Sequence, residues 1–214
     1  MKKHSKRYQV SEKVVDHNKA YTLKEAVAVI KNMSLPKFGG SVDLHFHLNI
    51  DSKKSDQMVR GTVVLPHGTG KTVRVAVFCR GEQERQAREA HAEYVGAQEL
   101  IDKVAGGFLD LDCAIATPDM MSGLMPSPKT GTVTTDIAKA IEDVKKGKVE
   151  FRVDKQGGVH LAVGKVAFEE DKIVENASKV IEALSEARPA SVKGKFINSI
   201  SISASMNPGL TLAL

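Results

Sequence analysis

The sequence contains no tryptophan, and aromatic side chains make up only 5% of its residues. A surface that binds nucleobases by stacking could therefore use few of them. No run of 18 or more apolar residues occurs, which excludes a membrane-spanning helix. The basic N-terminus, MKKHSKRYQVSEKV, is not followed by the apolar segment of a secretory signal. We therefore expect neither membrane association nor secretion.

Cysteine is also scarce. The two cysteines, Cys79 and Cys113, each lie in an apolar run. They are 34 positions apart, and this spacing is not that of a zinc motif. The pattern predicts two small core residues with reduced thiols, and hence a cytoplasmic protein.

The charge is basic and unevenly distributed. The 214 residues carry a formal net charge of +5, which favours a polyanionic partner. Residues 68–147 contain 10 Lys and Arg against 12 Asp and Glu, whereas the rest of the chain contains 21 against 14. A nucleic-acid footprint is therefore expected in the outer parts of the chain.

The two outer parts share one pattern of hydrophobic periodicity. Thr22 and Glu25 form a capping box at the start of a helix over 22–33. A second helix is expected over 169–187, and Gln156-Gly157-Gly158 suggests a hairpin. Alternating apolar and polar residues predict strands over 41–50, 58–65, 148–154, 159–166 and 195–205.

The middle part has a different pattern. Buried strands are expected over 72–79 and 113–117, and helices over 82–104 and 134–146, the second closed by Gly147. Strands that alternate with helices indicate a small parallel sheet with crossover helices. The fold class predicted is a split α+β domain, 1–67 plus 148–214, with an inserted α/β domain, 68–147.

The segment LPHGTGKT, residues 65–72, ends like a phosphate-binding P-loop. The P-loop pattern requires a glycine where Leu65 stands, and a helix after the loop. The residues after Thr72 predict a strand instead, so no helix N-terminus would receive phosphates. A nucleotide-binding enzyme that uses Lys71 is the alternative, and a flexible link containing Gly68 and Gly70 is favoured.

Two other pairs could carry chemistry. His45 and His47 share one face of a strand and could bind zinc if a third ligand arrived, but a polar sheet face explains them better. Asp110 and Asp112 could be a carboxylate pair, but they are more simply the polar approach to a strand. No serine-nucleophile G-x-S-x-G motif occurs.

Three features suit RNA binding. Lys37-Phe38 could offer one charge and one stacking face at the mouth of the first strand, although a core phenylalanine beside a solvated lysine is as plausible. Arg60 lies beside Gly61 near the next strand. A basic arm could follow a phosphate backbone or simply be solvated; it contains Lys2, Lys3, Lys6 and Arg7.

Longer blocks identify a family. The chain contains, in order, SDQMVRGTVVLPHGTGKTVRVAVF, EYVGAQELIDKV, ATPDMM, GLMPSPKTGTVTTDIAKA, KVEFRVDKQGGVH and SMNPG. Together they resemble the bacterial L-one family of large-subunit ribosomal proteins, and the resemblance covers essentially the whole chain.

The resemblance implies a split α+β domain with an inserted Rossmann-like, three-layer domain, joined by two hinge segments at His67, Gly68 and Gly147. It implies no enzymatic activity, and we expect neither cofactor nor metal. The implied partners are the stalk region of large-subunit ribosomal RNA, deacylated tRNA at the exit site, and the protein's own messenger RNA, whose translation it would repress. The protein would lie in the cytoplasm on the ribosome, and be a monomer away from it.

The same resemblance transfers RNA-contacting roles to six residues, Lys37, Phe38, Ser41, Lys155, Ser205 and Met206. Asn207 stands where the family has a glycine, so the turn there could be less tight. The family also carries a glycine- and arginine-rich loop between its ATPD-x-M and G-L-x-P blocks. Here Met121 is followed by Ser122 and then by Gly123, so the loop is absent.

Overall fold

The chain forms two compact units in the computed structural model. Unit 1 comprises Met1–Gly70 and Glu150–Leu214, and unit 2 comprises Lys71–Val149. The residues described are 5–16, 19–33, 36–51, 54–108, 110–118, 132–192 and 194–213. No helix within these ranges is long and apolar enough to cross a membrane. Unit 1 contains 20 Lys and Arg against 14 Asp and Glu, so it is the basic unit.

A four-stranded antiparallel sheet forms the centre of unit 1. Its strands are β7 (Gly158–Lys165), β1 (Ser41–Leu48), β8 (Ile197–Ala204) and β9 (Leu210–Thr211), in that order. Along β1 every second side chain is buried, because alternate residues of a strand point to opposite faces. The buried set is Val42, Leu44, Phe46 and Leu48.

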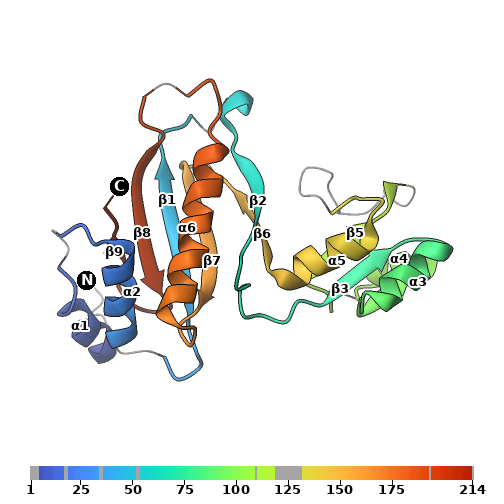
Figure 1. Ribbon diagram of the computed structural model, residues 1–214, viewed down its shortest axis with the longest axis horizontal. Helices are drawn as coiled ribbons and strands as arrows, with labels where there is room; N and C mark the ends of the chain where they lie inside the picture. Colours follow the sequence, from blue (N-terminus) through green and yellow to red (C-terminus); the bar gives the residue numbers. More distant parts are fainter. Residues whose placement is uncertain are drawn as a thin grey trace. The chain divides into compact units, whose positions relative to one another are not determined.

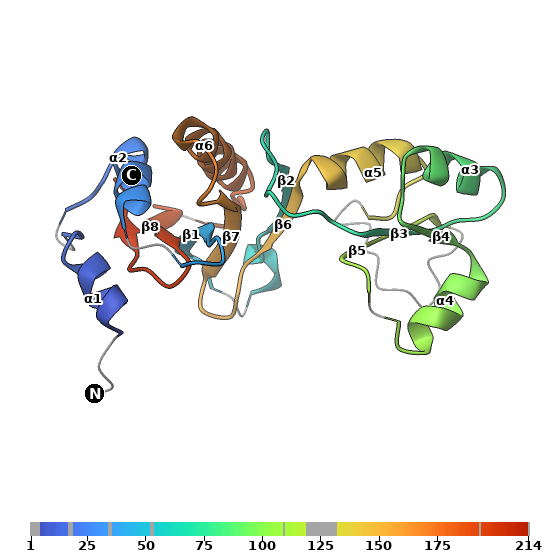
Figure 2. The same ribbon diagram turned by 90° about the horizontal axis from the view of Figure 1, so that it is seen from below.

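Two helices, α2 (Leu23–Asn32) and α6 (Glu170–Glu186), cover the apolar face of this sheet (Figure 2). Thr22 caps α2 through the predicted capping box, in which its side chain accepts from the N–H of Glu25 and the Glu25 carboxylate accepts in return. Helix α6 turns one apolar stripe inward, as a 3.6-residue period requires. That stripe contains Ile173, Ala177, Val180 and Leu184.

The remaining elements of unit 1 correct the sequence reading. Strands β2 (Arg60–Val64) and β6 (Lys148–Arg152) form a separate two-stranded sheet, with an ion pair of 2.7 Å between Arg60 Nη2 and Glu150 Oε1. The predicted hairpin is therefore wrong, because β6 pairs with β2 and β7 pairs with β1. The structure also contains helix α1 (Lys6–Glu12), the 3-10 turn η1 (Ser55–Gln57) and β9, which were not predicted.

Unit 2 is built on a three-stranded parallel sheet with the order β4-β3-β5. The strands are β3 (Val75–Phe78), β4 (Tyr94–Gly96) and β5 (Cys113–Ala116), and the helices are α3 (Glu82–Glu89), α4 (Gln98–Ala105) and α5 (Ile137–Lys146). The single helix predicted over 82–104 is wrong, because α3 and α4 are separate and β4 lies between them. The parallel sheet with crossover helices is present.

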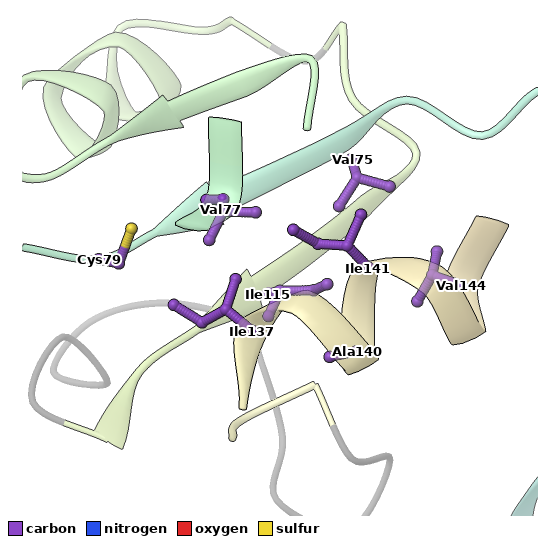
Figure 3. Packing of buried hydrophobic residues seen from close by; sticks show 9 residues of the cluster. Val75, Val77, Cys79, Ile115, Ile137, Ala140, Ile141 and Val144 are labelled. Atoms are coloured by element: carbon purple, nitrogen blue, oxygen red, sulfur yellow. The ribbon is translucent and has the colours of Figure 1, made fainter. Parts of the chain in front are cut away.

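The core of unit 2 forms where α5 packs on the sheet (Figure 3). Ile137 and Ile141 of α5 point toward Val77 of β3 and Ile115 of β5, and all four are fully buried. Cys79 belongs to the same cluster, and burial raises the pKa of its thiol to about 11. A thiol with so high a pKa is unreactive at neutral pH, so Cys79 acts as a core residue.

Candidate RNA interface

Ser41 and Ser205 are linked by hydrogen bonds at one end of the unit 1 sheet. Strands β1 and β8 are antiparallel, so the first residue of β1 lies beside the end of β8. The N–H of Ser41 donates to the Ser205 Oγ (3.0 Å), the N–H of Ser205 donates to the Ser41 carbonyl (3.0 Å), and the two hydroxyls are 3.1 Å apart. The Ser41 hydroxyl also donates to Asp43 Oδ2 (3.1 Å). We call this the Ser41 end of the sheet.

Two large apolar side chains flank this serine pair and are exposed to solvent. Phe38 lies in the turn before β1 and is 68% exposed, and Met206 lies in the turn after β8 and is 65% exposed. Single apolar side chains are common on protein surfaces, whereas two of them beside the same polar pair provide adjoining apolar surface for a contact. These two therefore offer a stacking ring and a flexible apolar surface to a ligand at the Ser41 end.

The backbone of Met206 is in the left-handed region, with φ of 63°. This conformation is uncommon for a residue other than glycine and costs free energy, about 1 kcal/mol or more. The turn is closed by the N–H of Asn207, which donates to the carbonyl of Ala204 (3.0 Å). Positive φ falls on Met206 and not on Asn207, so asparagine at 207 does not strain the turn. Both polar atoms of the Asn207 side chain are buried without a hydrogen-bond partner.

Basic residues approach the Ser41 end from two sides. Arg7 on α1 donates from Nη2 to the Met206 sulfur, 3.4 Å away, and Figure 1 shows α1 close to this end of the sheet. Lys37 is exposed in the turn that carries Phe38. The part of the predicted basic arm that the structure describes, Lys6 and Arg7, thus begins α1, and the structure brings Arg7 to Met206.

Glycine at position 40 permits the close approach of β1 and the turn after β8. A β-carbon added to Gly40 would lie 3.0 Å from the Ser205 Cβ and 3.3 Å from the Pro36 Cγ. Both distances are shorter than nine in ten contacts of real β-carbons, so Ser205 or Pro36 would have to shift by a few tenths of an ångström. The absence of a side chain at Gly40 therefore favours the close approach that the serine hydrogen bonds require.

Lys155 lies at the other end of the sheet. It is in the turn between β6 and β7, and the neighbouring Gly157 carbonyl accepts from the N–H of Leu48, the last residue of β1. At about 3.3 Å per residue, β1 separates this turn from Ser41 by roughly 20 Å. The structure thus brings together five of the six predicted RNA-binding residues and places the sixth elsewhere.

The predicted hinge residues lie at the ends of regular elements. His67 and Gly68 follow β2 and are held by α6, with His67 Nε2 2.5 Å from Glu175 Oε2. Gly147 ends α5 in the left-handed conformation, with φ of 107°, and its N–H bonds to carbonyls of the last turn. The glycine is the conformationally favoured residue at such a helix end.

The other candidate motifs have structural partners. Arg74 forms ion pairs with both Asp110 and Asp112. These contacts give the two carboxylates a structural role, as the polar approach to β5.

Lys71 is followed by β3 and not by a helix, so the P-loop context is missing. Among the residues that the structure describes, no three His, Cys, Asp or Glu side chains gather as metal ligands. His45 pairs with His160, a partner that the sequence did not reveal.

Comparison with known proteins assigns the chain to a family. The profile described as "Ribosomal protein L1p/L10e family" matches residues 2–124 and 121–208. The chain therefore belongs to this family. A protein named "Large ribosomal subunit protein uL1" from Fervidobacterium nodosum is 52% identical over 227 aligned residues, which cover 100% of this chain and 97% of the relative.

Two further relatives with the same name give a similar result. The protein from Thermosipho melanesiensis is 49% identical, with 98% of this chain and 96% of the relative covered. The protein from Lactobacillus acidophilus is 46% identical, with 99% and 97% covered. The resemblance seen in the sequence blocks is therefore confirmed over the full chain.

The comparisons also bear on the absent basic loop. The two segments of the family profile meet at residues 121–124, directly where that loop is absent. The 227 positions aligned with the Fervidobacterium protein exceed the 214 residues of this chain, so the relative has residues that this chain lacks. The position of the absent loop, after Met121, lies outside the described residues.

Proposed function

We propose that this protein is a non-enzymatic component of the large ribosomal subunit in the cytoplasm, and that it binds large-subunit ribosomal RNA through the Ser41 end of the unit 1 sheet. Membership of the family and the names of its relatives support the assignment to the large subunit. The basic charge of unit 1 supports a polyanionic ligand on that unit.

The observation that carries the RNA contact is the exposure of Phe38 and Met206 on either side of a hydrogen-bonded serine pair. Exposed aromatic rings bind unstacked RNA bases, and hydroxyls hydrogen-bond to base edges and to the 2′-hydroxyl. Lys37 and Arg7 add positive charge beside them. Such a surface suits a folded RNA with a loop or an internal bulge better than a regular duplex.

The finer role that we propose follows the family resemblance. The RNA would be the stalk region near the tRNA exit site, where the protein assists the release of deacylated tRNA. A similar structure in the protein's own messenger RNA would be bound in the same way, so that translation is repressed. The ribosomal RNA and the messenger RNA would both bind at the Ser41 end, because they share one structure.

Affinity for a stalk-type RNA hairpin, measured against salt concentration, tests the proposal. Phosphate contacts release counterions, so the logarithm of the affinity should fall steeply and linearly with the logarithm of the salt concentration. A hairpin with the same composition but a scrambled sequence serves as the control. Equal affinity for the two hairpins, or an affinity that salt does not change, would exclude the proposed function.

A further inference from the structure

Two histidines from neighbouring strands share a hydrogen bond in the middle of the polar face of the sheet. His45 on β1 and His160 on β7 are paired in register, and their Nδ1 atoms are 2.9 Å apart. On the other side, His45 Nε2 is 2.9 Å from the Ser203 Oγ on β8. A bond between two Nδ1 atoms requires that one donates and the other accepts. The contact therefore cannot survive when both rings are protonated.

The histidine pair lies in a hollow of about 270 Å³, which we call the imidazole groove. It is lined by side chains of β1, β7 and β8 and of the turn before β7, among them His45, His47, Gln156, His160, Ser199 and Ser201. The groove lies between the Ser41 end and the turn that carries Lys155. An RNA that touched both ends of the sheet would therefore cross it.

Asp154 lines the groove, and Asp43 lies near enough to His45 to act on its charge. Asp43 lies two residues before His45 on β1, and Asp154, in the turn before β7, has its Oδ2 3.7 Å from His160 Nε2. Strand β8 contributes hydroxyls and no charge at the positions that line the groove. With both imidazoles neutral these carboxylates leave the groove negative, which repels a phosphate backbone; a proton taken up by the histidine pair offsets one of the negative charges.

In the free protein, His45 favours its neutral form. Burial and the nearby His160 lower the pKa of His45, against a weaker opposing effect of Asp43. A phosphate that approaches the groove favours the charged imidazoles and offers their ring N–H groups an acceptor. Protonation of the pair therefore favours RNA binding, and RNA binding favours protonation by the same factor, as thermodynamic linkage requires.

We propose that RNA binding across the imidazole groove is coupled to the uptake of a proton by the His45–His160 pair, so that affinity for RNA rises as the pH falls. This inference rests on the proposed RNA-binding function and names a condition that regulates it. Complete uptake of one proton would raise the affinity about tenfold for each unit of pH.

Calorimetric titration of the full chain with the stalk-type hairpin tests the coupling. The binding heat near pH 6.5, measured in two buffers of different ionisation enthalpy, gives the number of protons taken up. We expect a net uptake approaching one proton, and an affinity that rises about tenfold or more from pH 7.5 to pH 6.0. A binding heat that does not depend on the buffer, together with an affinity that does not depend on pH, would overturn the inference while the proposed function stands. Failure to bind the hairpin at any pH would overturn both.

Variants assign the proton to the pair. His45→Gln and the more exposed His160→Gln should each bind RNA with a reduced proton uptake and a flatter pH profile. His47→Gln is the matched control, because His47 lines the same groove on the same strand but takes no part in the pair. Any protonation of the RNA itself is common to all four proteins. If both pair variants retained the full uptake, or if His47→Gln alone removed it, the pair would not be the coupled group.

Discussion

The backbone N–H of His67 donates a hydrogen bond to the side-chain Oδ1 of Asn176 over 3.1 Å. The Nδ2 of Asn176 donates to two further backbone carbonyls, those of Gly68 (3.0 Å) and Val163 (2.8 Å). Asn176 is fully buried on α6, and its amide therefore fixes the segment that leaves β2 against the helix and β7. The first predicted hinge is thus anchored at His67 and Gly68, and we expect bending to begin beyond them.

Replacing Asn176 by alanine should destabilise unit 1 by about 2–4 kcal/mol, because one buried and two partly buried backbone groups lose their partner. Urea unfolding followed by circular dichroism measures the change. Asn198→Ala is the matched control, since Asn198 is exposed on β8, and it should change the free energy of unfolding by less than about 0.5 kcal/mol. A similar small effect for Asn176→Ala would mean that the anchor contributes little.

Replacing Gly147 by alanine should destabilise α5 by about 1 kcal/mol, because φ of 107° is unfavourable for a residue with a β-carbon. The change should appear in thermal unfolding. Gly209→Ala provides the comparison, since an added β-carbon there meets no atom closer than 4.0 Å. Equal melting temperatures for the two variants would contradict a conformational role for Gly147.

The two chain crossings should allow the units to move on the microsecond-to-millisecond scale. Spectroscopic distances between labels on unit 1 and unit 2, measured with and without the stalk-type hairpin, check this expectation. We expect a broad distribution in the free protein and a different one with RNA. Identical narrow distributions in both states would exclude hinge motion coupled to binding.

Removing the exposed apolar side chains should weaken RNA binding without loss of stability. Phe38→Ala and Met206→Ala should each cost about 1–3 kcal/mol of binding free energy if these side chains pack on nucleosides. Val64→Ala, at an exposed apolar position on β2, is the control and should leave the affinity unchanged. Unchanged affinity in Phe38→Ala and Met206→Ala would show that neither side chain contacts the RNA.

Asp154 should make the stability of unit 1 dependent on pH in the acid range. Hydrogen bonds from the N–H groups of Gly158 and Gln156 lower the pKa of its carboxyl below the ordinary 3.8. A lowered pKa stabilises the folded state above about pH 4, and this contribution is lost as the pH falls through the folded-state value. Melting temperatures between pH 6 and pH 3 should therefore fall less in Asp154→Asn than in the unchanged protein. Parallel curves would contradict this contribution.

Local sequence patterns predicted the elements that depend on local periodicity. The capping box of α2, the alternation of β1 and the helix predicted over 169–187, which is α6, are all confirmed. The helix predicted over 82–104 failed because β4 has three residues and exists through its pairing with β3, a contact distant in sequence. His91, with φ of 60°, ends the first helical segment, and no glycine marks that position.

The residues of the candidate site could be predicted only through the family resemblance, which assigned RNA contacts to six positions. Sequence spacing put His45 beside His47, since both lie on one strand face, whereas the partner of His45 is set by the register between β1 and β7. The bond between Arg7 and Met206 joins residues 199 positions apart, so no local pattern could indicate it. Pairing across strands decides such contacts, and one sequence does not specify that register.

The eight residues of β1 hold the Lys155 turn and the Ser41 end at a fixed separation, because paired strands on both sides keep β1 extended. A ligand that contacts both ends of the sheet must therefore span the length of β1. An RNA fragment trimmed from one side should lose affinity in a single step, when it no longer reaches the second end, and not in equal decrements for each nucleotide removed.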